Sequence, residues 1–84
     1  MNPMDTCKKA VQTLEHAIKH IGRWDSDGWL AADCDHDAIT LLNLAKWGLE
    51  AMDSPATNRF WDEQRREYQR MIACLYAHNP GLNP

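Results

Sequence analysis

The sequence lacks the patterns that usually indicate chemistry. The 84 residues contain no glycine-rich phosphate loop, no G-x-S-x-G motif and no C-x-x-C pair. A compact helical fold of this size also leaves little room for a deep pocket. We therefore expect a protein that is not an enzyme, with no catalytic residues and no cofactor.

Cysteines and long apolar runs are scarce as well. Cys7, Cys34 and Cys74 stand far apart and are odd in number, which favours a reducing compartment over a disulfide scaffold. No stretch has the apolar length of a signal peptide or a membrane span. We expect a cytoplasmic protein without membrane contact.

Glycine and proline, four of each, fall at the ends of the chain and at a few joints. No run alternates apolar and polar residues as a half-buried strand would, so the pattern predicts helices throughout. The length suffices for one modest core. We predict a single all-α domain of three helices, at about residues 4–21, 27–52 and 55–78, with a frayed tail at 79–84.

Capping residues define the first and third helices. Asn2 before Pro3 is typical of a helix start, and Gly22 after the last apolar residue is typical of a helix end. Ser54 before Pro55 predicts the start of the third helix in the same way.

The extent of the central helix is ambiguous. Its main apolar face, followed backwards at about 100° per residue, includes Leu30, Ala31 and Cys34. We therefore expect one long helix over residues 27–52, with Cys34 turned inwards. An interruption near residues 33–37 is the alternative.

Beside the main face of the central helix, the small residue Gly48 allows a neighbouring helix to approach closely. A second apolar stripe runs along this helix, away from the main face. The stripe contains Trp29, Leu44 and Trp47. A central helix often buries two faces, so packing within a monomer explains the stripe about as well as an interface does. Because tryptophan is enriched at interface centres, we predict that these three residues anchor a homodimer or a larger host or client protein.

Residues 23–38, RWDSDGWLAADCDHDA, contain five aspartates. Aspartates near a helix start cap free N–H groups, which explains Asp25 and Asp27. The other three lie too far inside a helix that begins at residue 27 to cap its N-terminus. We predict that they form an electrostatic docking surface for a basic partner. Such a cluster could also imitate the charge of nucleic acid towards a nucleic-acid-binding protein. These three residues are Asp33, Asp35 and Asp37.

Two stretches of the sequence contain residue types that could form a metal site. The D-S-D-G sequence at residues 25–28 is similar to part of a calcium loop, but its glycine comes too early and the closing glutamate is missing. His16 and His20, with Cys34 and His36, have the residue types of a zinc site. The helical angle turns both helix-one histidines to solvent and Cys34 to the core. We expect no metal.

Four arginines raise the question of nucleic acid: Arg59, Arg65, Arg66 and Arg70. Small trihelical domains can present a recognition helix. Acidic residues are interleaved with these arginines, and the net charge is −3. A salt-bridged, solvated surface is the preferred interpretation, which makes nucleic acid an unlikely partner.

No motif identifies a family. The small size, the helical pattern and the lack of catalytic signatures are typical of accessory or inhibitor proteins such as mobile elements encode. We predict a non-enzymatic interaction module, homodimeric, that docks on a larger protein with a basic surface. A trihelical nucleic-acid-binding module is the first alternative, and a metal-binding helical protein is the second.

Overall fold

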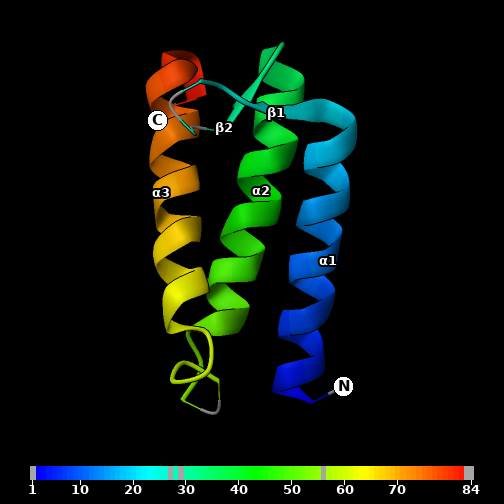
Figure 1. Ribbon diagram of the computed structural model, residues 1–84, viewed down its shortest axis with the longest axis vertical. Helices are drawn as coiled ribbons and strands as arrows, with labels where there is room; N and C mark the ends of the chain where they lie inside the picture. Colours follow the sequence, from blue (N-terminus) through cyan, green and yellow to red (C-terminus); the bar gives the residue numbers. More distant parts are fainter. Residues whose placement is uncertain (1, 27, 29, 56, 83–84) are drawn as a thin grey trace.

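The computed structural model describes residues 2–26, 28, 30–55 and 57–82. These residues form a small helical fold, which confirms the predicted all-α class. The elements are α1 (Pro3–Ile21), β1 (Gly22–Trp24), β2 (Leu30–Ala32), α2 (Asp35–Met52), α3 (Asp62–His78) and a 3₁₀ turn (Pro80–Leu82). α1 and α3 run in the same direction on either side of α2, which runs the opposite way, and the two strands cross one end (Figure 1).

α1 begins and ends at the capping residues that the sequence indicates. The side chain of Asn2 accepts a hydrogen bond from the backbone N–H of Asp5 at 2.9 Å, and Pro3 occupies the first helical position. At the other end the N–H of Gly22 donates to the carbonyl of Ile18. The helix therefore starts one residue before the predicted position and ends where predicted.

The expected helix over residues 27–52 is wrong in its first part, and so is the expectation that the chain has no strand. Leu30 and Ala31 are buried, as the helical angle required, but they reach the core from β2. β2 pairs with β1 in an antiparallel hairpin, where Gly28 adopts φ 78°, a conformation that glycine adopts without strain. α2 begins at Asp35, within the stretch where the alternative placed an interruption.

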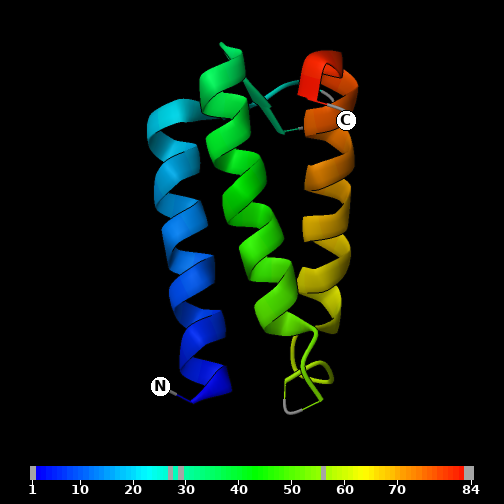
Figure 2. The same ribbon diagram turned by 180° about the vertical axis from the view of Figure 1, so that it is seen from behind.

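One hydrophobic cluster joins the three helices and the hairpin. α2 lies in front when the molecule is seen from behind, with α1 and α3 on its two flanks (Figure 2). Its inward face meets both neighbours, so the core is built around this helix. The buried members of the cluster are Cys7, Leu14, Ile18, Leu30, Ala38, Leu41, Leu42, Ala45, Met52, Tyr68 and Leu75.

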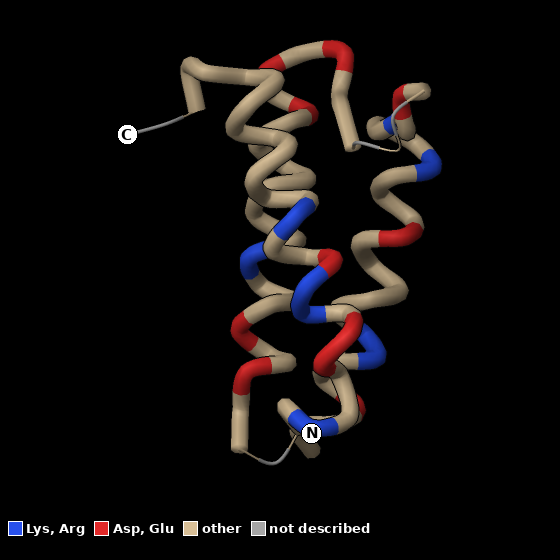
Figure 3. The backbone as a smooth tube through the Cα atoms, turned by 60° about the vertical axis from the view of Figure 1, so that its left-hand side comes forward, with Lys and Arg blue, Asp and Glu red and all other residues tan. Residues whose placement is uncertain are grey.

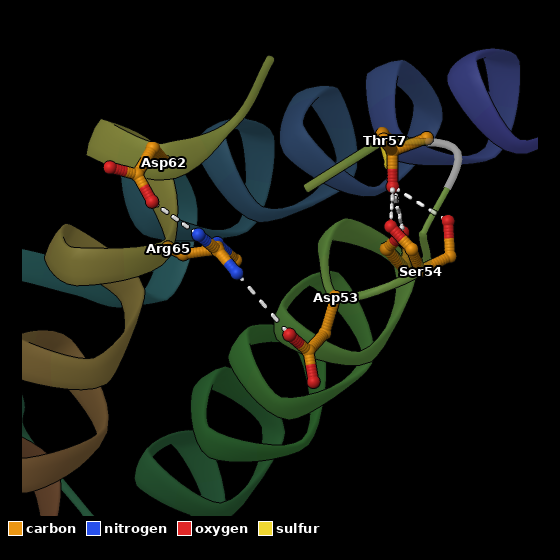
Figure 4. Close-up of polar contacts among 7 residues, drawn as sticks. Asp53, Ser54, Thr57, Asp62 and Arg65 are labelled. Atoms are coloured by element: carbon orange, nitrogen blue, oxygen red, sulfur yellow. Dashed lines mark hydrogen bonds and ion pairs between the residues drawn. The ribbon is translucent and has the colours of Figure 1, made fainter. Parts of the chain in front are cut away.

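The connection from α2 to α3 differs from the prediction. The third helix starts at Asp62 rather than at residue 55, and Ser54 does not cap it. Instead, the buried hydroxyl of Thr57 donates to the carbonyl of Ala51 at 3.1 Å and lies 2.8 Å from the hydroxyl of Ser54 (Figure 4). These bonds hold the chain in a turn where a helix was expected.

An arginine fixes this turn against α3. Arg65 pairs with Asp53 at 3.3 Å, where α2 ends, and also with Asp62 in the first turn of α3 (Figure 4). Two acidic residues on one guanidinium therefore join the end of one helix to the start of the next.

Candidate functional site

Trp47 lies on the face of α2 that points away from the core. The buried residues of α2 include Ala38, Leu41 and Ala45, and at about 100° per residue Trp47 falls almost opposite them. Its side chain is 37% exposed, and nearby Ile39 is 44% exposed. Two apolar side chains therefore stand on the outer side of α2, separated by exposed Asn43, and we call this surface the Trp47 strip and define it by Ile39 and Trp47.

The rest of the predicted second stripe is partly covered. Leu44 is half-buried and packs against the core cluster, so it flanks the core instead of projecting freely. On the other flank the Lys46 ammonium lies 5.4 Å from the ring centroid of Tyr76 on α3. The prediction for Trp29 falls outside the described residues. Of the two predicted anchors that the structure describes, Trp47 is the exposed one.

The three predicted steering aspartates gather where α2 begins. Because the helix starts at Asp35, both Asp35 and Asp37 stand in its first turn, near the positive end of the helix dipole. The expectation that they lie too deep to cap the helix is therefore wrong. Asp33 precedes the helix and pairs with Arg23 of β1 at 3.2 Å. Figure 3 shows acidic positions collected at this end of the molecule.

Cys34 is exposed, which corrects the prediction that it turns inwards. The helical angle does not apply to it, because it precedes α2 as the N-cap. Its sulfur accepts a hydrogen bond from the N–H of Asp37 at 3.5 Å.

The other residues of the zinc-site alternative do not join Cys34. His16 and His20 are exposed on α1, as predicted, with ring centroids 4.4 Å apart. Across the part of the chain that the structure describes, no three His, Cys, Asp or Glu side chains come together in a way that could hold a metal ion.

The arginines of the nucleic-acid alternative are mostly engaged with neighbours. Arg66 pairs with Asp62 at 3.3 Å, and Arg65 makes the two ion pairs described above. The guanidinium of Arg59 lies 5.9 Å from the ring centroid of Phe60. Positive and negative positions alternate along α3 (Figure 3). Arg70 differs, because it lines a pocket.

That pocket is the feature that sequence reasoning missed. It has a volume of about 350 Å³ and lies between α1 and α3, next to the hairpin. Val11 and Leu14 of α1 face Tyr68 and Met71 of α3 across it. These residues recur at helical spacing along their two helices, but that spacing does not show that a space remains between the helices.

The pKa of the Tyr68 hydroxyl reflects the electrostatics of this pocket. Burial raises the pKa of its hydroxyl, the negative charges of Glu15 and Glu67 raise it further, and the pKa reaches about 12. Both glutamates line the pocket. The interior of the pocket therefore disfavours negative charge.

Comparison with protein-family models, curated proteins and solved structures finds no match to this chain. Among the described residues, no helix combines the length and the apolar character needed to cross a membrane. The geometry of the two surfaces described above is therefore the basis for the proposals that follow.

Proposed function

We propose that this chain is a non-enzymatic interaction module that docks on a larger protein with a basic surface. The Trp47 strip supplies the apolar contact, and Asp33, Asp35 and Asp37 supply the charge. The observation that carries the proposal is the exposure of Trp47, at 37%, on the side of α2 opposite the core.

A partner that covers the exposed indole removes apolar surface from water. Burying apolar surface is favourable by about 25 cal/mol per Å². Tryptophan is also among the residues that contribute most to binding when they lie near the centre of an interface. Exposed Ile39, about two turns away on the same helix, offers a second apolar contact.

The apolar strip and the acidic end are close enough for one partner. Trp47 and Asp37 are ten residues apart on α2, which corresponds to about 15 Å along a straight helix. An interface of standard size buries about 800 Å² on each partner and spans more than this distance. Exposed Asp33 and Asp35 then raise the encounter rate with a basic surface more than they raise the final affinity.

Site-specific photo-crosslinking in the native cell tests this proposal. A photoreactive phenylalanine analogue replaces Trp47 in one variant and Phe60 in a control variant. Phe60 is 66% exposed and belongs to the connection between α2 and α3, not to the Trp47 strip. We expect position 47 to crosslink to a defined larger protein through a basic surface segment, and position 60 not to do so.

Sedimentation equilibrium of the Trp47→Ala variant separates self-association from docking. A fall in mass from dimer to monomer assigns the Trp47 strip to the homodimer. Leu44→Asp is a poor test, because Leu44 packs against the core and its replacement would destabilise the fold. The proposal would be wrong if positions 47 and 60 gave the same crosslinked products and the Trp47→Ala variant kept the mass of the native protein.

A further inference from the structure

The pocket between α1 and α3 is a second surface, separate from the Trp47 strip. Its volume of about 350 Å³ falls within the range of about 300 to 1,000 Å³ that small-ligand sites occupy. Val11, Leu14 and Met71 supply apolar walls. The space is therefore suited to an apolar stem with one polar end.

Tyr68 supplies a polar group at the wall of the pocket. Its side chain lines the pocket and is 3% exposed. Among the described residues, none makes a hydrogen bond with its hydroxyl. The hydroxyl oxygen can therefore accept a hydrogen bond from a ligand that enters the pocket.

The charged side chains around the pocket determine which ligand charge is favoured. Glu15 from α1 and Glu67 from α3 both line it, as does Arg70, so two carboxylates stand against one guanidinium. Arg70 lies towards the hairpin, with one guanidinium nitrogen 3.8 Å from where a Cβ on Gly28 would stand. The glutamates on the two helices leave the region around Tyr68 negative, and they help to raise the pKa of Tyr68 to about 12.

An aromatic ring stands at the hairpin side of the same pocket. Trp24 of β1 lines it and remains 52% exposed. The face of an indole ring attracts cations more strongly than that of any other aromatic side chain. Arg70 stands towards the same side, so it is the two glutamates beside Tyr68 that favour a positively charged group in the pocket.

We infer that this pocket binds an organic cation on an apolar stem, a guanidinium or alkylammonium group such as an arginine side chain or a small free amine carries. Its N–H groups donate to Glu15, Glu67 and the oxygen of Tyr68, and its stem contacts Val11 and Met71. Ammonium and guanidinium groups donate hydrogen bonds and accept none, so the Tyr68 oxygen acts as acceptor.

The test is an NMR titration of the ¹⁵N-labelled full chain with n-butylguanidinium, using n-butylurea as the neutral control of similar shape. We expect saturable shifts at Glu15, Tyr68 and the indole of Trp24 with the cation, and no saturation with the urea. A short blocked peptide with one arginine distinguishes the sources. Tighter binding of the peptide indicates a side chain of a partner protein, and tighter binding of the free cation indicates a small amine.

Three variants make the assignment specific. Tyr68→Phe keeps the ring and loses the hydrogen bond to a charged group, so we expect roughly tenfold weaker binding. Glu15→Gln combined with Glu67→Gln should weaken binding roughly fivefold or more. The control is Glu50→Gln, which removes an exposed carboxylate from α2 and should change nothing.

Circular dichroism confirms that each variant is folded before binding is measured. Equal binding of n-butylguanidinium and n-butylurea would overturn the inference, and so would unchanged cation affinity in the folded variants. These measurements need no partner protein, so they fail or succeed independently of the docking proposal.

Discussion

The ring of Tyr68 on α3 lies directly against Gly48 on α2. A Cβ added at Gly48 would overlap the Cε2 atom of Tyr68 and stand 3.0 Å from its Cδ2 atom. Glycine within a helix costs about 1 kcal/mol relative to alanine, so its presence here needs a packing reason. The close approach of the two helices supplies it, and the same contact holds Tyr68 at the wall of the pocket.

Gly48→Ala should destabilise the fold. The gain in helix propensity is about 1 kcal/mol, while forcing a methyl group into a packed contact typically costs about 1 to 3 kcal/mol. We expect a net loss of about 1 kcal/mol in the free energy of unfolding, measured by urea denaturation. Gly81→Ala is the control, because nothing lies within 4 Å of a Cβ there. A stabilised Gly48→Ala variant would show that the helices separate without cost.

Thr57→Val should weaken the connection between α2 and α3. The substitution keeps the shape of the side chain and removes the hydroxyl that donates to the carbonyl of Ala51. Because Thr57 is buried, we expect a loss of about 1 to 2 kcal/mol in urea denaturation. Thr13→Val is the matched control, since its hydroxyl bonds the carbonyl of Lys9 within one helix. An equal loss in the free energy of unfolding for Thr57→Val and Thr13→Val would mean that the buried Thr57 hydroxyl stabilises the fold no more than an exposed one.

Cys34→Ser should stabilise α2. Cys34 is the N-cap, and its sulfur accepts from the N–H of Asp37 at 3.5 Å, whereas a serine oxygen is a far stronger acceptor. We expect a gain of about 0.5 to 1 kcal/mol in the free energy of unfolding. Cys34→Ala lacks an acceptor and should give no gain. If serine and alanine behave alike, the cap does not contribute to stability.

The parts of the fold that the sequence predicts correctly are those with a local cause. Asn2, Pro3 and Gly22 act on their own helix, so the bounds of α1 could be read directly. The closeness of another helix at Gly48 was also predictable, because a glycine beside an apolar helix face leaves room for a neighbouring helix to approach.

The errors arise where a non-local contact decides between two local patterns. Leu30 and Ala31 suit a helix face and a short strand equally well, and strands of three residues are too short to show alternation. The Asp27-Gly28 pair was the available signal, since Asp-Gly favours hairpin turns. Thr57 gave no such signal, because its burial depends on the end of α2.

Of the two candidate sites, one follows from a local sequence pattern and the other depends on non-local packing. The position of Trp47 opposite the core follows from the helical period, so it was predictable. The α1–α3 pocket depends on the distance between two helices that are far apart in the sequence, which no local pattern fixes. No local pattern singles out Glu15 and Glu67, which the fold brings together at the pocket beside Tyr68.

The hydroxyl of Tyr68 should make the stability of the protein fall at high pH. Its pKa is raised from 10.0 to about 12, chiefly by burial and then by Glu15 and Glu67. The neutral form is favoured in the folded state, so this contribution is complete below pH 10 and is lost as the pH rises from about 10 to about 12. Between about pH 9 and about pH 11 the free energy of unfolding should fall by about 1 kcal/mol more in the native chain than in Tyr68→Phe. Urea denaturation at the two pH values measures this difference, and Tyr76→Phe, which keeps the Tyr68 hydroxyl, should retain the full decrease. An identical decrease in Tyr68→Phe and the native chain would mean that the raised pKa does not exist.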